Sequence, residues 1–227
     1  MCGRFAFINN LIQLKEEFEV DDPTFDLMPN YNVAPSQIII AIVKDEGTSK
    51  LAQFRWGLIP FWSKDENIGY KLINARSETI HEKSSFKQAF EKRRCLIVAS
   101  GFFEWKKIGK QKIPMYITLK TRKPLSFAGL WEIWKSPEGD EIKSCTIITT
   151  SPNKLMESIH NRMPAIMPAE HREQWLDNSH FDESKLKQSL MPYSDAEMEV
   201  WEVNKNVNSP QNNSEKNIQP VKPSNLF

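Results

Sequence analysis

Cys2, which directly follows Met1, has the most distinctive chemistry in the sequence. A small second residue favours removal of the initiator methionine, by an aminopeptidase or by the protein itself, so we expect the mature chain to begin at Cys2. Its α-amine and thiol would then lie on adjacent carbons, and both titrate close enough to neutral pH to act as nucleophiles. Such a 1,2-aminothiol condenses with an aldehyde to a Schiff base, which the thiol closes to a thiazolidine.

Two other interpretations of Cys2 remain open. The residue is incidental in a protein that binds its partner without covalent chemistry. Alternatively, it is the nucleophile of an N-terminal peptidase or amidohydrolase, because glutaminases of that class also begin Met-Cys-Gly. Those glutaminases typically carry an Asn-Gly pair for the oxyanion hole. The absence of any Asn-Gly dipeptide here weakens the glutaminase interpretation.

Four further segments carry polar groups that suit proton transfer or ligand binding: 30–35 (NYNVAP), 74–78 (NARSE), 101–105 (GFFEW) and 160–164 (HNRMP). Asn74 offers an amide donor and acceptor, Glu104 a carboxylate between aromatic rings, and His160 an imidazole that titrates near neutral pH. Each also has a structural explanation. Asn74 is a turn former, Glu104 fits the solvated face of a strand, and His160 suits a helix end.

The composition excludes several other classes of protein. The 227 residues contain 30 Lys+Arg and 29 Asp+Glu, a net charge of +1, which argues against a polycationic binder but permits a local basic groove. Mean hydropathy is −0.52, and the longest aliphatic run, 38–43, is too short to cross a membrane. No phosphate-loop, dinucleotide-binding, HExxH or CxxC motif is present, so we expect neither a cofactor nor a metal.

The three cysteines, an odd number without paired spacing, predict a reducing, cytoplasmic compartment. Cys95 and Cys145 lie in apolar runs and are expected in the core.

The pattern along the chain predicts more strands than helices. Expected helices cover 11–18, 84–93, 153–160, 169–176 and 183–190. Expected strands cover 37–43, 51–56, 95–99, 115–119, 126–131, 145–150 and 197–203, with polar turns at 44–50 and 107–112. No internal repeat or shift in composition marks a domain boundary.

Six pieces of the sequence, in order, resemble one family: MCGRF (1–5), YNVAP (31–35), WGLIP (56–60), NARSET (74–79), GFFEW (101–105) and HNRMP (160–164). They resemble the SOS response-associated peptidase (SRAP) family, the abasic-site processing proteins. The polar segment 203–221, which ends in Ile-Gln-Pro-Val, resembles the family's closing segment. The resemblance therefore covers nearly the whole chain.

The resemblance implies covalent capture of abasic single-stranded DNA. Mature Cys2 would form a thiazolidine with the ring-opened sugar aldehyde, which protects the site during repair of damaged DNA. Glu104 and His160 would take the acid–base roles, and Asn74 would orient the reacting groups. These types suit the chemistry, because opening the sugar and dehydrating the carbinolamine both need proton donors and acceptors. Position 161 is Asn where the family usually has Asp, which we expect to alter the orientation of its neighbours without disabling the site.

Family positions that contact DNA fall on Arg4, Asn32, Trp62, Arg76 and Arg162. The arginines are expected to hold phosphates, and Trp62 to stack on bases or wedge against a duplex end. Neighbouring Phe61 would either join Trp62 or pack in the core, and Trp105 is expected to be structural. Because an abasic site lacks a base, we expect sequence-tolerant recognition through the DNA backbone.

We therefore predict an α+β fold with one domain over residues 1–221, and a frayed C-terminal end at 222–227. Mainly antiparallel strands should form a barrel-like core flanked by helices, with 204–221 packed back as an ordered loop. The N-terminus and residues 74, 104 and 160 should converge on one groove. The expected partner of this monomer is abasic single-stranded DNA, with no membrane contact. In a bacterium the protein would lie in the cytoplasm with the nucleoid.

Overall fold

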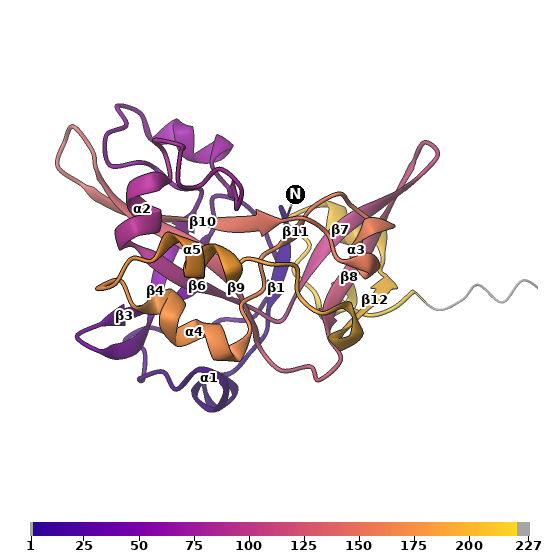
Figure 1. Ribbon diagram of the computed structural model, residues 1–227. Coiled ribbons are helices and arrows are strands. Elements are labelled where there is room, and N and C mark those ends of the chain that lie inside the picture. Colours follow the sequence, from indigo (N-terminus) through magenta and orange to yellow (C-terminus); the bar gives the residue numbers. More distant parts are fainter. Residues whose placement is uncertain (1, 222–227) are drawn as a thin grey trace, which may run out of the picture.

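Five strands close into a barrel at the centre of the computed structural model, which describes residues 2–221 (Figure 1). The strands are β3 (Ile38–Asp45), β4 (Thr48–Trp56), β6 (Arg94–Ala99), β9 (Leu125–Lys135) and β10 (Glu141–Thr150). They follow the order β10-β4-β3-β6-β9, and β9 pairs back with β10 to close the ring. All these pairings are antiparallel except that of β4 with β10. The predicted α+β fold with a barrel-like core is confirmed.

A second sheet of five strands stands beside the barrel. Its order is β12-β8-β7-β1-β2, formed by β1 (Phe5–Phe7), β2 (Asn30–Val33), β7 (Gly101–Ile108), β8 (Gln111–Leu119) and β12 (Met198–Glu202). Strands β7 and β8 form a long hairpin in register from Phe102↔Ile117 to Ile108↔Gln111. The polar turn predicted over 107–112 is therefore wrong in extent. Cross-strand pairing continues to the two-residue tip, where Gly109 adopts a positive φ of 58°.

Two short strands extend the barrel wall at the end of β10. Strand β5 (Asn74–Arg76) continues where β4 stops pairing, with Ile147↔Asn74 and Thr149↔Arg76. Strand β11 (Met163–Pro164) takes the opposite side of β10, at Thr149↔Pro164. The NARSE and HNRMP segments, far apart in the sequence, therefore meet around one strand end.

Helices lie outside the barrel (Figure 1). They are α1 (Leu11–Phe18), α2 (Lys87–Lys92), α3 (Lys154–Glu157), α4 (Ala169–Leu176) and α5 (Glu183–Gln188), with 3-10 turns η1 (Glu66–Lys71), η2 (Asp195–Glu197), η3 (Lys205–Asn208) and η4 (Glu215–Asn217). The predicted helices over 11–18 and 169–176 are confirmed in extent. Asn10 caps the N-terminus of α1, and its side chain accepts from the Gln13 amide in a capping box. No helix within residues 2–221 has the length and apolar character to cross a membrane.

The core contains both cysteines that were expected there: Cys95 and Cys145 are fully buried. A buried arginine, Arg94, joins two helices to the barrel. Its guanidinium donates to the carbonyl oxygens of Phe90 at the end of α2 and Trp175 in α4, each at 2.8 Å. Further acceptors are the carbonyls of Glu91, Asp177 and His180.

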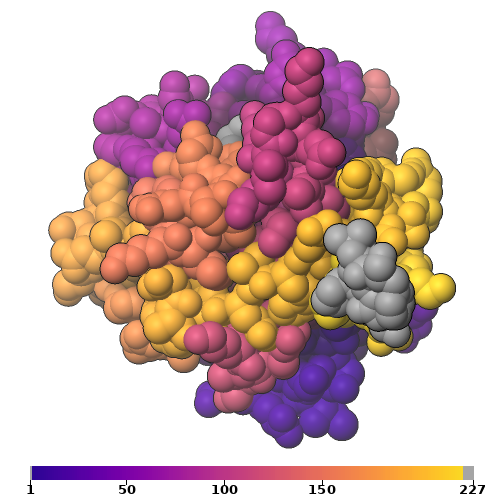
Figure 2. Space-filling view, turned by 90° about the vertical axis from the view of Figure 1, so that its right-hand side faces the viewer, coloured from indigo at the N-terminus to yellow at the C-terminus, as the bar shows by residue number. Residues whose placement is uncertain are grey.

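The segment 203–221 lies against the second sheet as a polar, ordered strap (Figure 2). Val203 bridges Pro220, and the Val221 amide donates to the Glu202 carbonyl at 2.9 Å. Val207 and Asn217 are buried, so this asparagine-rich stretch is held by specific contacts.

Candidate functional site

The N-terminal strand runs antiparallel to β7, which brings Cys2 to the carboxylate of Glu104. Phe5 pairs with Phe102, and the amide of Phe103 donates to the carbonyl of Arg4 at 2.9 Å. Continuing this register toward the N-terminus places residues 2 and 3 opposite the stretch of β7 that contains Glu104. The predicted contact between the N-terminus and the GFFEW segment thus follows from strand pairing.

Cys2 is fully buried. Burial raises the pKa of its thiol, and the nearby negative charge of Glu104 raises it further. The thiol faces the Arg4 carbonyl at 4.0 Å, and the Cys2 carbonyl accepts a hydrogen bond from Asn74 Nδ2 at 2.8 Å. The thiol is therefore protonated at neutral pH, and its conversion to a nucleophile needs a proton acceptor.

Only the donor side of the Asn74 amide is bonded to the N-terminal strand. Its Nδ2 holds the Cys2 carbonyl, whereas its Oδ1 is buried and has no hydrogen-bond partner among residues 2–221. A buried acceptor without a partner is unfavourable by about 1–3 kcal/mol, so Oδ1 is suited to accept from an incoming group. Arg76 lies two residues further along β5 and hence on the same face, and its side chain is exposed.

His160 lines an open groove of about 490 Å³ next to this strand, together with Arg76, Glu78, Thr79, Asn161 and Arg162. Its Nδ1 accepts from the backbone amide of Arg162 at 3.1 Å. Nδ1 also lies 3.3 Å from the Arg162 carbonyl oxygen, to which it would donate in the other tautomer, so Arg162 orients the ring in either tautomer. Arg76 of this groove lies on β5 two residues after Asn74, which contacts Cys2, so β5 connects the groove with the N-terminal strand.

Arg162 is paired with a carboxylate that the sequence reasoning did not single out. Both terminal nitrogens of Arg162 bond to Glu78, and Nη2 also reaches Thr149. The ion pair lowers the pKa of Glu78. The available signal was the position of Glu78 in the NARSE segment, two residues after Arg76. Only pairing through space reveals that it neutralises Arg162.

Arg4 and Asn32 hold the strap 203–221 in place. Arg4 Nη1 donates to Asn32 Oδ1 and to the Val207 carbonyl, both at 2.7 Å, and its guanidinium lies over the Trp105 ring at 5.9 Å. Asn32 is fully buried and donates to the carbonyls of Ser209 and Asn212, both at 2.9 Å. The contacts of both residues are therefore structural, and their DNA contacts stay a prediction.

Trp62 and Phe61 form an exposed aromatic pair beyond β4, 47% and 50% accessible. The indole of Trp62 donates to the Ser84 carbonyl at 3.3 Å, which orients the ring. The alternative that Phe61 packs in the core is wrong. Two exposed rings side by side in the sequence are the type of surface on which bases stack.

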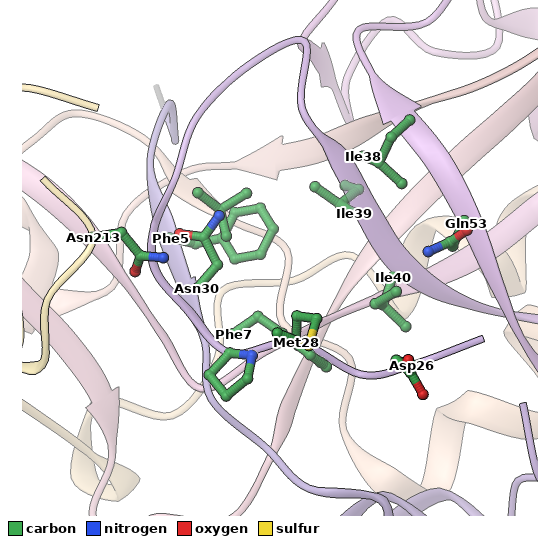
Figure 3. A pocket seen from close by; sticks show the side chains of 12 residues that line it. Phe5, Phe7, Asp26, Met28, Asn30, Ile38, Ile39, Ile40, Gln53 and Asn213 are labelled. Carbon is green, nitrogen blue, oxygen red and sulfur yellow. The ribbon is translucent and has the colours of Figure 1, made fainter. Parts of the chain in front are cut away.

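A separate cavity of about 370 Å³ lies between β1, β2 and β3 (Figure 3). It is lined mainly by apolar side chains, among them Phe5, Met28 and Ile39, and holds none of the four residues predicted to be catalytic. The candidate site is therefore the region around Cys2 together with the His160 groove. Within residues 2–221 no group of three or more His, Cys, Asp or Glu side chains is arranged to hold a metal ion.

The fold and the site together define a closed-barrel protein with a buried cysteine, whose backbone carbonyl is bonded to an asparagine amide and whose thiol lies near a carboxylate, and with a groove that contains histidine and arginine. A family model described as SOS response associated peptidase (SRAP) matches residues 1–210. The chain belongs to this SRAP family.

Named relatives and a solved structure agree with the assignment. The abasic site processing protein YoqW of Bacillus subtilis is 48% identical over 222 residues, covering 96% of this chain and 99% of the relative. The abasic site processing protein HMCES of Xenopus tropicalis is 35% identical over 193 residues, covering 71% and 57%. A crystal structure of a Bacteroides thetaiotaomicron protein superposes with a TM-score of 0.79 at 32% identity, covering 85% of this chain and 86% of that one.

Proposed function

We propose that this protein captures abasic sites in single-stranded DNA by forming a thiazolidine between Cys2 and the ring-opened sugar aldehyde. The names of the relatives support the substrate. The observation that carries the chemistry is the contact of Cys2 with Asn74 and the electrostatic effect of Glu104 on the Cys2 thiol. Removal of Met1 belongs to the proposal, because an amide nitrogen at Cys2 cannot form a Schiff base.

The raised pKa of the thiol sets the order of the steps. The free amine of Cys2 attacks the aldehyde carbon first and forms a carbinolamine, which takes up one proton from solvent and loses water to give an iminium ion. The thiol then adds to the iminium carbon, and its proton passes to the Glu104 carboxylate. One water leaves for each thiazolidine formed. Glu104 thereby serves as the proton acceptor that a protonated thiol requires.

His160 and Asn74 act on the ring-opening sugar and on the carbinolamine that follows it. His160, which the backbone of Arg162 orients in the groove, protonates the sugar oxygen as the ring opens. The unpartnered Oδ1 of Asn74 accepts from the attacking amine or from a sugar hydroxyl. Arg76 is the exposed arginine of the groove, positioned for an adjacent phosphate.

The test uses a single-stranded oligonucleotide with one uracil, treated with uracil glycosylase and mixed with protein whose N-terminal mass is known. A band that survives heating on a denaturing gel is expected from wild-type protein, and none from Cys2→Ala or from a form that keeps Met1. An adduct of equal yield with Cys2→Ala would overturn the proposal. Loss of Met1 in wild type but not in Glu104→Gln would identify self-removal, whereas loss in both would identify an aminopeptidase.

The peptidase or amidohydrolase alternative gains no support from the geometry. Its nucleophile would need a proton acceptor such as Glu104 as well, so the raised pKa of the thiol does not favour it over thiazolidine formation.

A further inference from the structure

The hairpin formed by β7 and β8 concentrates positive charge in a protein that is otherwise acidic. Its outer part, residues 106–112 (KKIGKQK), contains four lysines and no carboxylate, and no other seven-residue run of the chain does so. The rest of the chain has 26 Lys+Arg against 29 Asp+Glu, a net charge of −3. The near-neutral total charge is therefore the sum of a strongly basic hairpin and a mildly acidic remainder of the chain.

The lysines of this basic hairpin are presented to solvent without competing partners. Lys107, Lys110 and Lys112 are exposed, and no ion pair involves them among residues 2–221. Lys107 lies directly opposite Lys112 across the two strands. Like charges in directly opposed positions destabilise a sheet, so this pair favours an anion bound along the hairpin.

The basic hairpin leads away from the candidate site. Strand β7 contains Glu104 at its buried end and Lys106 to Ile108 at its outer end. At about 3.3 Å per residue, Ile108 lies about 13 Å beyond Glu104 along the strand. Figure 1 and Figure 2 both show the hairpin projecting past the body of the molecule. A strand of DNA held at Cys2 and running along β7 would meet these lysines within a few nucleotides of the abasic site.

Two of the three arginines assigned to phosphate binding are occupied within the protein. Arg162 is paired with Glu78, and Arg4 holds Asn32 and the Val207 carbonyl. Of these three arginines, only Arg76 is exposed, and it lines the groove. The largest group of available cations near the site is thus the basic hairpin.

We propose that the basic hairpin 106–112 is a second DNA contact, which binds the sugar–phosphate backbone of a strand flanking the abasic site. This inference rests on the proposed function for the identity of the ligand and extends it beyond the reactive centre. Lysine ammonium groups contact phosphates without reading bases, so the contact tolerates any flanking sequence. Non-covalent affinity, rather than the covalent step, depends on it.

The test measures binding of an intact single-stranded oligonucleotide by fluorescence anisotropy at several salt concentrations. The variant Lys107→Gln/Lys110→Gln/Lys112→Gln is compared with the control Lys92→Gln/Lys120→Gln/Lys143→Gln. The control removes three exposed lysines from other elements, none of them in an ion pair within residues 2–221. Three lost phosphate contacts reduce the slope of log affinity against log salt by about 2, since each contributes about 0.7 on a single strand.

Between 50 and 200 mM salt, wild type and control should therefore lose about twenty-fold more affinity than the hairpin variant. Equal slopes for the hairpin and control variants would overturn the inference, as would a slope change seen with RNA but not with DNA. Adduct formation with an abasic strand is scored separately, at low salt and saturating protein. If wild type forms no adduct, the proposed function fails while the slopes still decide the role of the hairpin.

Discussion

Asn74→Ala separates the structural and chemical roles of one amide. The substitution removes the 2.8 Å hydrogen bond to the Cys2 carbonyl and the buried Oδ1 acceptor. Leaving a buried carbonyl without its donor lowers the free energy of unfolding by about 1–3 kcal/mol. For a chain of this size, each kcal/mol lowers the melting temperature by about 2–4 °C. If the same energy is lost from the transition state of capture, the rate falls by about 5- to 150-fold.

The assay is single-turnover capture of an abasic oligonucleotide at saturating protein, with thermal unfolding measured on the same samples. Asn74→Asp retains an acceptor oxygen but loses the donor, so it should share the loss of stability and lose less of the rate. Asn161→Ala, which removes an exposed amide from the groove wall, is the matched control. Variants that melt early yet capture at the wild-type rate would refute the chemical role of Asn74 and leave it as a structural contact.

Three further outcomes are expected. Cys2→Ser retains the amine but lacks the thiol, so borohydride should trap its Schiff base with abasic DNA while no heat-stable adduct forms without the reductant. Burial, and to a smaller extent Glu104, raises the pKa of the Cys2 thiol. The rate at which iodoacetamide alkylates Cys2, followed by peptide mass, should therefore still increase above pH 9, and in Glu104→Gln this rate should reach its plateau at a lower pH. Arg94→Met should lower the free energy of unfolding in denaturant by more than about 3 kcal/mol, since several buried carbonyls lose their donor, whereas Lys92→Met on the adjacent helix should change it little.

Local patterning predicted seven of the twelve strands that residues 2–221 form, and it missed β1, β2, β5, β7 and β11. The helices over 11–18 and 169–176 have apolar spacing and clear ends, and both form as predicted. The stretch 107–112 is polar enough to read as a turn, yet most of it is strand because each residue finds a partner across the hairpin. Short β5 and β11 carry too little pattern of their own. They exist because the end of β10 offers unpaired backbone groups on both sides.

The sequence predicted which residues belong to the site, but it did not predict which side chains contact one another there. Cys2, Asn74 and Glu104 were selected for their chemistry. Strand pairing of β1 with β7 accounts for the proximity of Cys2 and Glu104, whereas Asn74 reaches Cys2 from β5, which pairs with β10. The occupied state of Arg162 could not be predicted, because its partner Glu78 is 84 residues away in sequence. Charge identifies a cation, but only the fold decides whether a carboxylate already neutralises it.

The division between a buried thiol and exposed cations explains how a protein of net charge +1 can act on a polyanion. Burial keeps the Cys2 thiol protonated and unreactive toward chance electrophiles, so reactivity requires both a free amine and a proton acceptor such as Glu104. Long-range attraction then has to come from elsewhere, since Arg4 and Arg162 are engaged internally. A projecting hairpin with four lysines supplies that attraction at a distance from the reacting amine and thiol. Affinity and chemistry are thereby assigned to opposite ends of the same strand, β7.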